Sequence, residues 1–236
     1  MDLITEILDR AAPDPLPSPL DRWGLLVVLA TAAVAASWWP ACRLLRPAVT
    51  LVHELGHAAV GIAAGRRFTG FVLRSDMSGH AVTIGRPRGV GVVATTWAGY
   101  PAPAVLGGLF VWLATHGWSA PTLTVLLGAL VLSLLYARSP LTALVVVGVV
   151  AGVGALWWWR DDALQQQVLT GAGVLLLVGA WRHLAAVVRG PSPGSDPAVL
   201  AASTRLPAGL WLASFVLVMG LMTWPVVNHV LAALSG

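Results

Sequence analysis

Hydrophobic residues lie in long runs along this chain, and short polar segments separate the runs. Seven runs approach the roughly 20 residues that an α-helix needs to cross a bilayer. The expected spans cover residues 23–39, 44–64, 90–114, 120–136, 141–159, 164–188 and 207–230. The pattern therefore predicts an all-α polytopic membrane protein with about six or seven transmembrane helices.

Three polar segments interrupt this pattern. Residues 1–22 carry five acidic residues and four prolines, and they lack the basic start of a secretory signal. Residues 65–89 contain five arginines, and residues 189–206 are rich in proline, glycine and serine. No long linker is present, so the whole chain, 1–236, is expected to form a single integral membrane domain.

The 65–89 segment is predicted to form a small membrane-associated β-hairpin. β-like runs at 69–73 and 80–84 flank Ser75-Asp76-Met77-Ser78-Gly79, a sequence with turn chemistry. An exposed strand there can pair with an extended substrate by β-addition. The alternative is a hairpin that merely connects two spans.

The 90–114 run contains the sequence Gly99-Tyr100-Pro101-Ala102-Pro103. Two prolines so close together break or bend a helix. Irregular backbone at membrane depth is tolerated only where it is buried in protein or lines a cavity. We therefore expect a broken helix that lines a cavity.

Composition agrees with a membrane protein and limits its partners. Hydrophobic residues make up 57% of the chain and charged residues 10%, against about 25% in soluble domains. The net charge of +4 comes from arginines at the ends of spans, which indicates topology and not nucleic-acid binding. The single cysteine, Cys42, excludes an internal disulfide and a cysteine-based zinc site. The lipid bilayer is thus the expected surrounding.

The arginines also predict an orientation. If the N-terminus is cytoplasmic and there are seven spans, eleven arginines lie on the cytoplasmic side, and only Arg43, Arg46 and Arg160 lie on the other. Cytoplasmic loops carry an excess of basic residues in membrane proteins. The sequence therefore predicts that residues 1–22 and the 65–89 hairpin are both cytoplasmic.

The strongest chemical motif is His53-Glu54-Leu55-Gly56-His57, inside the predicted 44–64 span. Ionisable residues within a span are costly, and composition gives this H-E-x-x-H order an expected chance occurrence of about one in a thousand. Two histidines four residues apart share a helix face and can bind one zinc ion, with the glutamate as general base. The alternative is a pair of hydrogen-bonding histidines beside a buried glutamate.

Catalytic zinc needs a third protein ligand and an open position for water. Four residues can approach from the predicted cytoplasmic side: Asp196, Asp76, His80 and His183. We favour Asp196, which requires the 189–206 segment to bend back into the membrane. The sequence around Asp196 is equally typical of a helix start followed by proline. His80 or Tyr100 is a candidate for contacting the bound substrate or stabilising the oxyanion.

An ordered set of motifs resembles a known family. The HELGH motif is followed by Ser78-Gly79-His80, by Gly99-Tyr100-Pro101, and by S-D-x-x-x-L-A-x-x-T-x-L-P-A-x-x-W at residues 195–211. This set resembles the site-2 protease family of intramembrane zinc metalloproteases, specifically a short bacterial branch without PDZ or CBS domains. Better-known members carry their ligating aspartate in an N-P-x-x-x-L-D-G-like sequence, which has no counterpart here.

The resemblance implies that Asp196 is the third zinc ligand. It also implies a protease of the bacterial cytoplasmic membrane that cleaves membrane-embedded or membrane-tethered proteins. The alternative is a non-catalytic membrane protein that keeps the scaffold and binds a client. A metal or proton transporter is a weaker alternative, because its ionisable groups are expected on several spans and here they concentrate on one.

Overall fold

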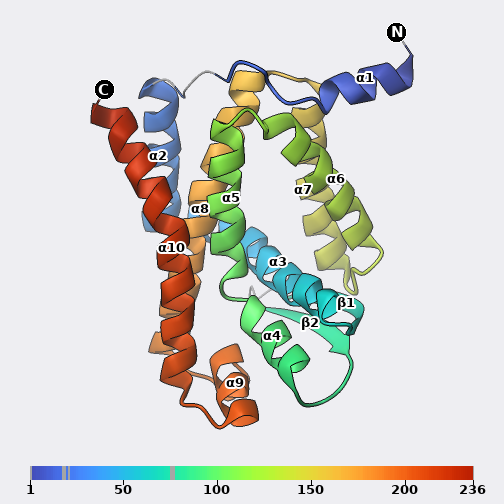
Figure 1. The fold of residues 1–236 in the computed structure, drawn as a ribbon, viewed down its shortest axis with the longest axis vertical. Coiled ribbons are helices and arrows are strands. Elements are labelled where there is room, and N and C mark those ends of the chain that lie inside the picture. Colours follow the sequence, from blue (N-terminus) through green and yellow to red (C-terminus); the bar gives the residue numbers. More distant parts are fainter. Residues whose placement is uncertain (1, 18–19, 21, 75–77, 236) are drawn as a thin grey trace.

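The chain is helical apart from one hairpin in the computed structural model (Figure 1), which describes residues 2–17, 20, 22–74 and 78–235. Its elements are α1 (Leu3–Arg10), α2 (Arg22–Ser37), α3 (Trp39–Ala63), β1 (Arg67–Leu73), β2 (Gly79–Ile84), α4 (Val90–Ala98), α5 (Ala102–Thr115), α6 (Ser119–Leu134), α7 (Pro140–Trp158), α8 (Asp162–Arg189), α9 (Asp196–Thr204) and α10 (Ala208–Ser235). The predicted helical membrane fold with one small hairpin is confirmed.

Several helices have the length and composition of membrane spans. In the described part of the chain, α7, α8 and α10 are each long and apolar enough to cross a bilayer, and α4 with α5 counts as a fourth if the bent pair is one span. α2 and α6 are apolar but shorter. α3, with 25 residues, is not in this group, since Arg43, Arg46 and Glu54 lower its hydropathy. The predicted 44–64 span is therefore a helix of mixed character.

The first two predicted spans follow one another in the same direction. α2 begins beside the N-terminal segment and ends near mid-height, where the Arg182 guanidinium donates to the Ala36 carbonyl (Figure 1). α3 restarts after Trp38 and runs obliquely toward the hairpin. Proline fits the first turn of a helix, and Pro40 occupies that turn in α3. The short connection predicted at residues 43–46 is therefore part of the helix.

This path places the described N-terminal residues, 2–17, at the end of the molecule away from the hairpin (Figure 1). The Asp14 N–H donates to the Gly117 carbonyl at 2.8 Å, and the Arg10 guanidinium donates to the Trp158 carbonyl. Both acceptors follow helices that lead away from the hairpin (Figure 1). The sequence predicts that both segments are cytoplasmic, whereas the fold puts their described residues at opposite ends of the molecule (Figure 1).

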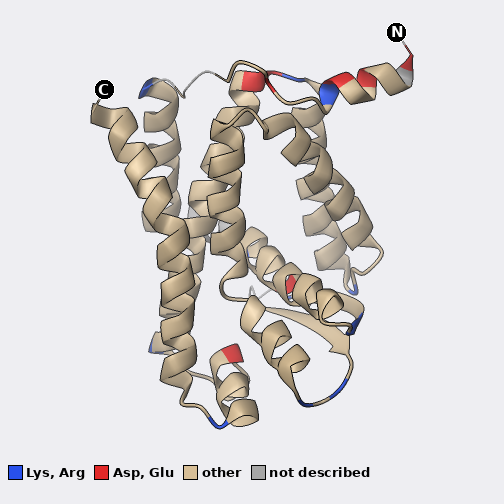
Figure 2. Cartoon of the chain, viewed as in Figure 1, with Lys and Arg blue, Asp and Glu red and all other residues tan. Residues whose placement is uncertain are grey.

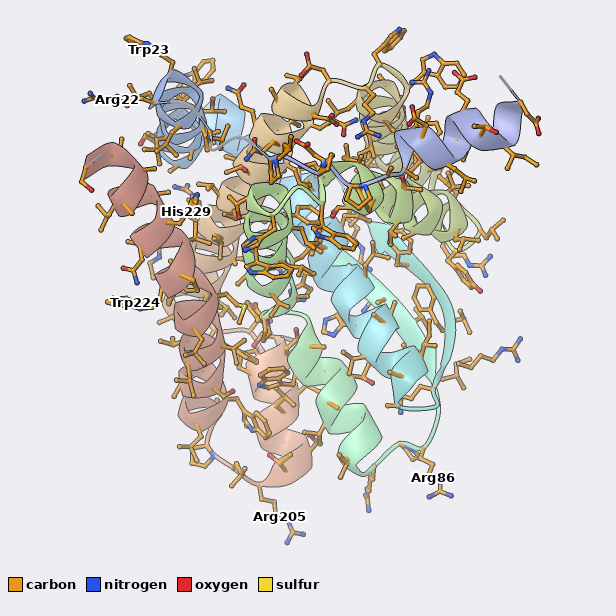
Figure 3. All side chains as sticks on the ribbon, turned by 45° about the horizontal axis from the view of Figure 1, so that its top comes forward. Arg22, Trp23, Arg86, Arg205, Trp224 and His229 are labelled. Carbon is orange, nitrogen blue, oxygen red and sulfur yellow. The ribbon has the colours of Figure 1, made fainter. Side chains whose placement is uncertain are left out.

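Charge divides between the same two ends (Figure 2). Eight arginines belong to the hairpin, to its neighbours or to the segment around α9: Arg66, Arg67, Arg74, Arg86, Arg88, Arg138, Arg189 and Arg205. The acidic side chains of α1 and of the α7–α8 turn lie at the opposite end. Arg86 and Arg205 project from the first end, while Arg22 and Trp23 lie at the second (Figure 3).

The hairpin is antiparallel and has one edge covered by the chain itself. β1 pairs with β2 from Arg67↔Ile84 to Leu73↔Gly79. On the outer edge of β1, the Phe71 N–H donates to the Tyr136 carbonyl at 2.9 Å, and the Phe71 carbonyl accepts from the Arg138 N–H. The predicted turn residues 75–77, Asp76 among them, lie outside the described residues. The connection between α6 and α7 thus extends the sheet on the β1 side only.

The predicted helix break is confirmed at residues 99–101. α4 ends at Ala98, α5 begins at Ala102, and the two helices are bent by 63°. Pro101 and Pro103 are buried. The irregular backbone is therefore enclosed by protein, as expected for a chain interruption at membrane depth.

Close helix crossings hold the bundle together, and the α5–α8 pair has the most extensive contact. A Cβ atom added to Gly107 would lie 2.6 Å from the Gly173 carbonyl oxygen, and one added to Gly173 would lie 2.5 Å from the Gly107 carbonyl oxygen. Small residues allow such backbone approach in membrane helices. The crossing depends on the absence of side chains at both positions.

We predict that Gly107→Ala and Gly173→Ala each destabilise the protein. The new methyl group must push α5 and α8 apart, and overpacking of this kind costs about 1–3 kcal/mol. Gly148→Ala is the matched control, because a Cβ there meets nothing within 4 Å and alanine favours a helix over glycine. The thermal unfolding midpoint in detergent should fall for the first two variants only; an equal midpoint in all three would contradict the close crossing.

Candidate metal centre

The HELGH residues lie in the second half of α3, where the chain is covered on several sides. The exposed fractions of His53, Glu54 and His57 are 6%, 4% and 9%. His53 and His57 are four residues apart, so they lie on one face of the helix, and their Nε2 atoms are 3.1 Å apart. Glu54 turns toward the hairpin, where the backbone of Gly79 lies against its carboxylate.

Asp196 reaches the two histidines from far along the chain. Its Oδ2 atom lies 3.2 Å from His53 Nε2 and 3.3 Å from His57 Nε2. Three ligands placed tetrahedrally about 2.0–2.1 Å from a zinc ion are separated from one another by about 3.3–3.4 Å. The spacing of the three atoms, in a group that could hold a metal ion, therefore fits a zinc ion without rearrangement.

The chemical state of these atoms also fits a cation. His57 Nδ1 lies 2.7 Å from the Thr95 carbonyl oxygen, which can only accept, so the ring proton is on Nδ1 and Nε2 offers its lone pair. The buried Asp196 Oδ2 has no hydrogen-bond partner in the described part of the chain. Electron-rich atoms held this close need a proton or a metal cation between them.

Asp196 lies outside the candidate spans, and its surroundings favour the ionised form. Burial alone would raise the pKa of its carboxyl, but without a metal the protonated imidazoles of His53 and His57 donate hydrogen bonds to it and hold that pKa below its usual range; a bound cation would take the place of those protons. Metals bind the deprotonated carboxylate. The group is thus in the form that ligation requires.

Two glycines let other segments approach the site. A Cβ atom at Gly99 would lie 2.5 Å from His57 Nε2 and 2.7 Å from His53 Cε1. A Cβ atom at Gly56 would overlap with Ala102 on the far side of the helix break. The broken helix α4–α5 can therefore lie directly on the histidine face of α3, which explains why this face is covered.

The inward position of Asp196 depends on the packing of α9. Leu200 is fully buried in a core cluster with Tyr100, Phe215 and Met219. Asp196 is the first residue of α9, and Ser195 occupies the N-cap position without a side-chain cap bond, since its hydroxyl donates to the Ser192 carbonyl. The helix-start pattern and the ligand position therefore coexist at Asp196.

The structure separates the other candidate residues. Tyr100 is buried, and its ring meets that of His53 edge-on with centroids 5.0 Å apart. His183 of α8 lies beside His53, with ring centroids 4.9 Å apart. His80 is exposed on β2 and does not belong to the group of close ligand atoms among the described residues. Asp76 lies outside the described residues.

Sequence reasoning did not find Thr95 or the steric role of Gly99. Thr95 contributes through its backbone carbonyl, which every residue type carries, so its side chain gives no indication. Gly99 stood out only as part of a helix break. Its closeness to both imidazoles becomes visible when α4 is placed against α3.

A cavity of about 250 Å³ lies between α3, the hairpin and α7. It is mainly apolar, and its lining residues are Pro47, Thr50, Leu73, Arg74, Ser78, Leu141 and Val145. Thr50 lies one helical turn before Glu54, and the backbone of Gly79 approaches both side chains. The cavity therefore reaches to within one turn of the glutamate.

Comparison with known proteins agrees with this geometry. A family model described as Peptidase M50B-like matches residues 25–226, a stretch that includes the HELGH motif, the hairpin, the broken helix and Asp196. Neither a curated protein nor a solved structure matches the chain. Since the match covers most of the sequence, the chain belongs to the M50B-like peptidases, a site-2 protease family of membrane metalloproteases.

Proposed function

We propose that this protein is an intramembrane zinc metalloprotease that hydrolyses peptide bonds of membrane-embedded or membrane-tethered proteins. The observation that carries the proposal is the triangle of His53, His57 and Asp196, whose ligand atoms have the spacing of a tetrahedral zinc site. Glu54 lies beside the triangle on the same helix. Three protein ligands leave one coordination position open, as in catalytic zinc sites.

The metal supplies the electrophilic part of the chemistry. Zinc bound at such a site lowers the pKa of water toward about 7 and polarises a carbonyl group. The His57–Thr95 hydrogen bond fixes the ring orientation that this binding needs. His53 and His57 are buried and Asp196 is half-buried, which limits the access of competing water to the site.

Glu54 moves the proton. We assign its carboxylate as the general base that takes a proton from the attacking water and later delivers it to the leaving amine. It is 4% exposed, and the Gly79 backbone covers it. The adjacent apolar cavity gives a side chain of the substrate a place next to this carboxylate.

The free edge of β2 is the proposed docking strand. Because Phe71 bonds outward to Tyr136 and Arg138, the pair Phe71↔Ala81 is of the non-hydrogen-bonded type, and the Ala81 N–H and carbonyl also point away from β1. In the described chain no backbone partner lies on that edge at Ala81. An extended peptide added there would run past Gly79 and Glu54.

A helix shields its own carbonyl groups from attack, and pairing with a strand would hold the substrate in an extended form that exposes them. A substrate segment must unwind before a peptide carbonyl can reach the site, and edge pairing replaces the hydrogen bonds lost on unwinding. Of the two candidates for oxyanion stabilisation, Tyr100 is better placed than His80. Tyr100 lies against His53, whereas His80 is exposed on β2.

We place the hairpin end of the molecule on the cytoplasmic side of a bacterial cytoplasmic membrane. Eight arginines belong to that end against Arg10, Arg22 and Arg160 at the other, and basic residues concentrate in cytoplasmic segments. The acidic residues 1–22 then lie on the opposite side. In this orientation the metal site, which lies between α3 and α9, is nearer the cytoplasmic side, because both helices approach the hairpin end (Figure 1).

Glu54→Gln should abolish cleavage while leaving fold and zinc binding intact. Glutamine has nearly the same shape but cannot accept the proton, and loss of a general base costs about 10²–10⁴-fold in rate. The measurement is membrane proteomics of cells with the wild-type protein or Glu54→Gln, searching for a fragment pair that only the wild type produces. Glu6→Gln, on exposed α1, is the matched control. Fragments that persist in Glu54→Gln would refute the mechanism.

Asp196→Ala should reduce zinc affinity by more than the roughly 10–100-fold that loss of a supporting hydrogen bond costs, since it removes a ligand. Zinc content and affinity of the detergent-purified protein measure this. Asp162→Asn serves as control, because Asp162 pairs with Arg160 at the far end of the molecule. Wild-type affinity in Asp196→Ala would instead favour a different third ligand, and absence of zinc from the wild type would favour a non-catalytic scaffold.

Ala81→Pro should weaken substrate binding without loss of zinc. Proline removes the outward N–H of the β2 edge and is tolerated in edge strands. Ala81→Ser keeps the N–H and is the control. With a purified membrane substrate, KM should rise in the proline variant alone, while the zinc content of both variants stays equal. An unchanged KM would exclude pairing at this edge.

A further inference from the structure

His183 is a half-buried imidazole beside the metal centre, and the proposed mechanism has no role for it. It lies on α8, and its ring centroid is 4.9 Å from that of His53 and 4.9 Å from that of Tyr100. Tyr100 in turn stacks on Phe215 of α10, with centroids 5.2 Å apart. The three rings thus connect a ligand histidine to the core formed by α8 and α10.

The two ligand histidines differ in how their second nitrogen is held. His57 Nδ1 has the Thr95 carbonyl at 2.7 Å. His53 Nδ1 is buried and has no hydrogen-bond partner in the part of the chain that the structure describes. Metal-binding histidines almost always donate their other ring N–H to an acceptor, which fixes the tautomer and the ring orientation. His53 therefore lacks a partner that its role requires.

His183 is the neighbour best able to supply that partner. A neutral imidazole has one nitrogen that donates and one that accepts, and the His183 ring lies against that of His53. His57 is unsuited, because its Nδ1 is bound to Thr95 and its Nε2 faces the metal position. The Tyr100 ring meets the His53 ring edge-on, with an angle of 87° between the ring planes. The planes of the His183 and His53 rings are tilted by 43°.

Helix register keeps the two imidazoles together. Val49 of α3 packs into Gly179 of α8, where an added Cβ would overlap with the valine side chain. His53 and His183 each lie four residues, or one helical turn, further along. Because α3 and α8 run in the same general direction, the glycine contact fixes the distance between the histidines (Figure 1).

We propose that His183 is a positioning residue of the metal centre. When the metal is bound, His183 accepts a hydrogen bond from His53 Nδ1 that the metal-free structure does not contain; this bond keeps the proton off His53 Nε2 and directs that atom at the metal. This inference rests on the proposed function, since it presupposes that His53 is a ligand. It assigns His183 a role in metal affinity and none in contacting substrate.

The test measures zinc affinity of the detergent-purified full chain by competition with a chelator. His183→Leu and His183→Phe remove the acceptor, and we expect each to weaken zinc binding by about 10–100-fold. His183→Gln retains an acceptor oxygen and should stay within a few-fold of the wild type. The absorption spectrum of the cobalt(II)-loaded protein provides a second readout, which should change in the first two variants and be restored in the third.

Two control variants separate positioning from general damage. Leu177→Ala removes buried packing on the same helix. His229→Leu removes an exposed imidazole on α10. Neither variant should change zinc affinity, even if its thermal unfolding midpoint falls. If His183→Phe binds zinc like the wild type, or if His183→Gln is as weak as His183→Phe, the inference is wrong. If the wild type itself binds no zinc, the proposed function fails instead.

Discussion

The meeting of Asp196 with His53 and His57 is the contact on which the rest of the structure depends. Burying one carboxylate and two imidazoles in an apolar interior is unfavourable unless they are paired or share a cation. The three atoms converge at 3.1–3.3 Å, so a single ion can satisfy them together. Removal of any one member would leave the others buried without a partner. The site is therefore a unit that the surrounding helices must close around.

Backbone contacts at glycines make this closure possible. The helix break packs on the rings of His53 and His57 at Gly99, and the hairpin packs on Glu54 at Gly79. Helix α8 packs on α3 at Gly179. Each contact brings a different segment to within van der Waals distance of α3. Helix association in membranes relies on such packing, because lipid is as apolar as the side chains. The same close approaches that stabilise the bundle thus enclose the polar site.

Much of the fold was predictable, because membrane helices are specified by local hydrophobic runs. The helix boundaries, the hairpin and the break at residues 99–101 follow from periodicity and from Gly and Pro positions. The HELGH motif and Asp196 were predicted to meet, and the structure brings them together. The direction of α3 was not predictable from local pattern, since Pro40 and Arg43 are compatible with either a turn or a helix start. The contacts with Thr95 and His183 depend on tertiary packing alone.

The oblique path of α3 also explains how a helix with so many polar groups is tolerated. α3 does not stand in lipid as an independent span; its second half is covered by the hairpin, by α4 and by α9. The ionisable residues of that half, His53, Glu54 and His57, are surrounded by protein, whereas unpaired charges in hydrocarbon are expensive. One side of the site is thus bounded by the hairpin and α9, which belong to the arginine-rich end. In the proposed mechanism, water and an unwound peptide would approach Glu54 from that end, so that neither has to cross the apolar bundle formed by α5, α8 and α10.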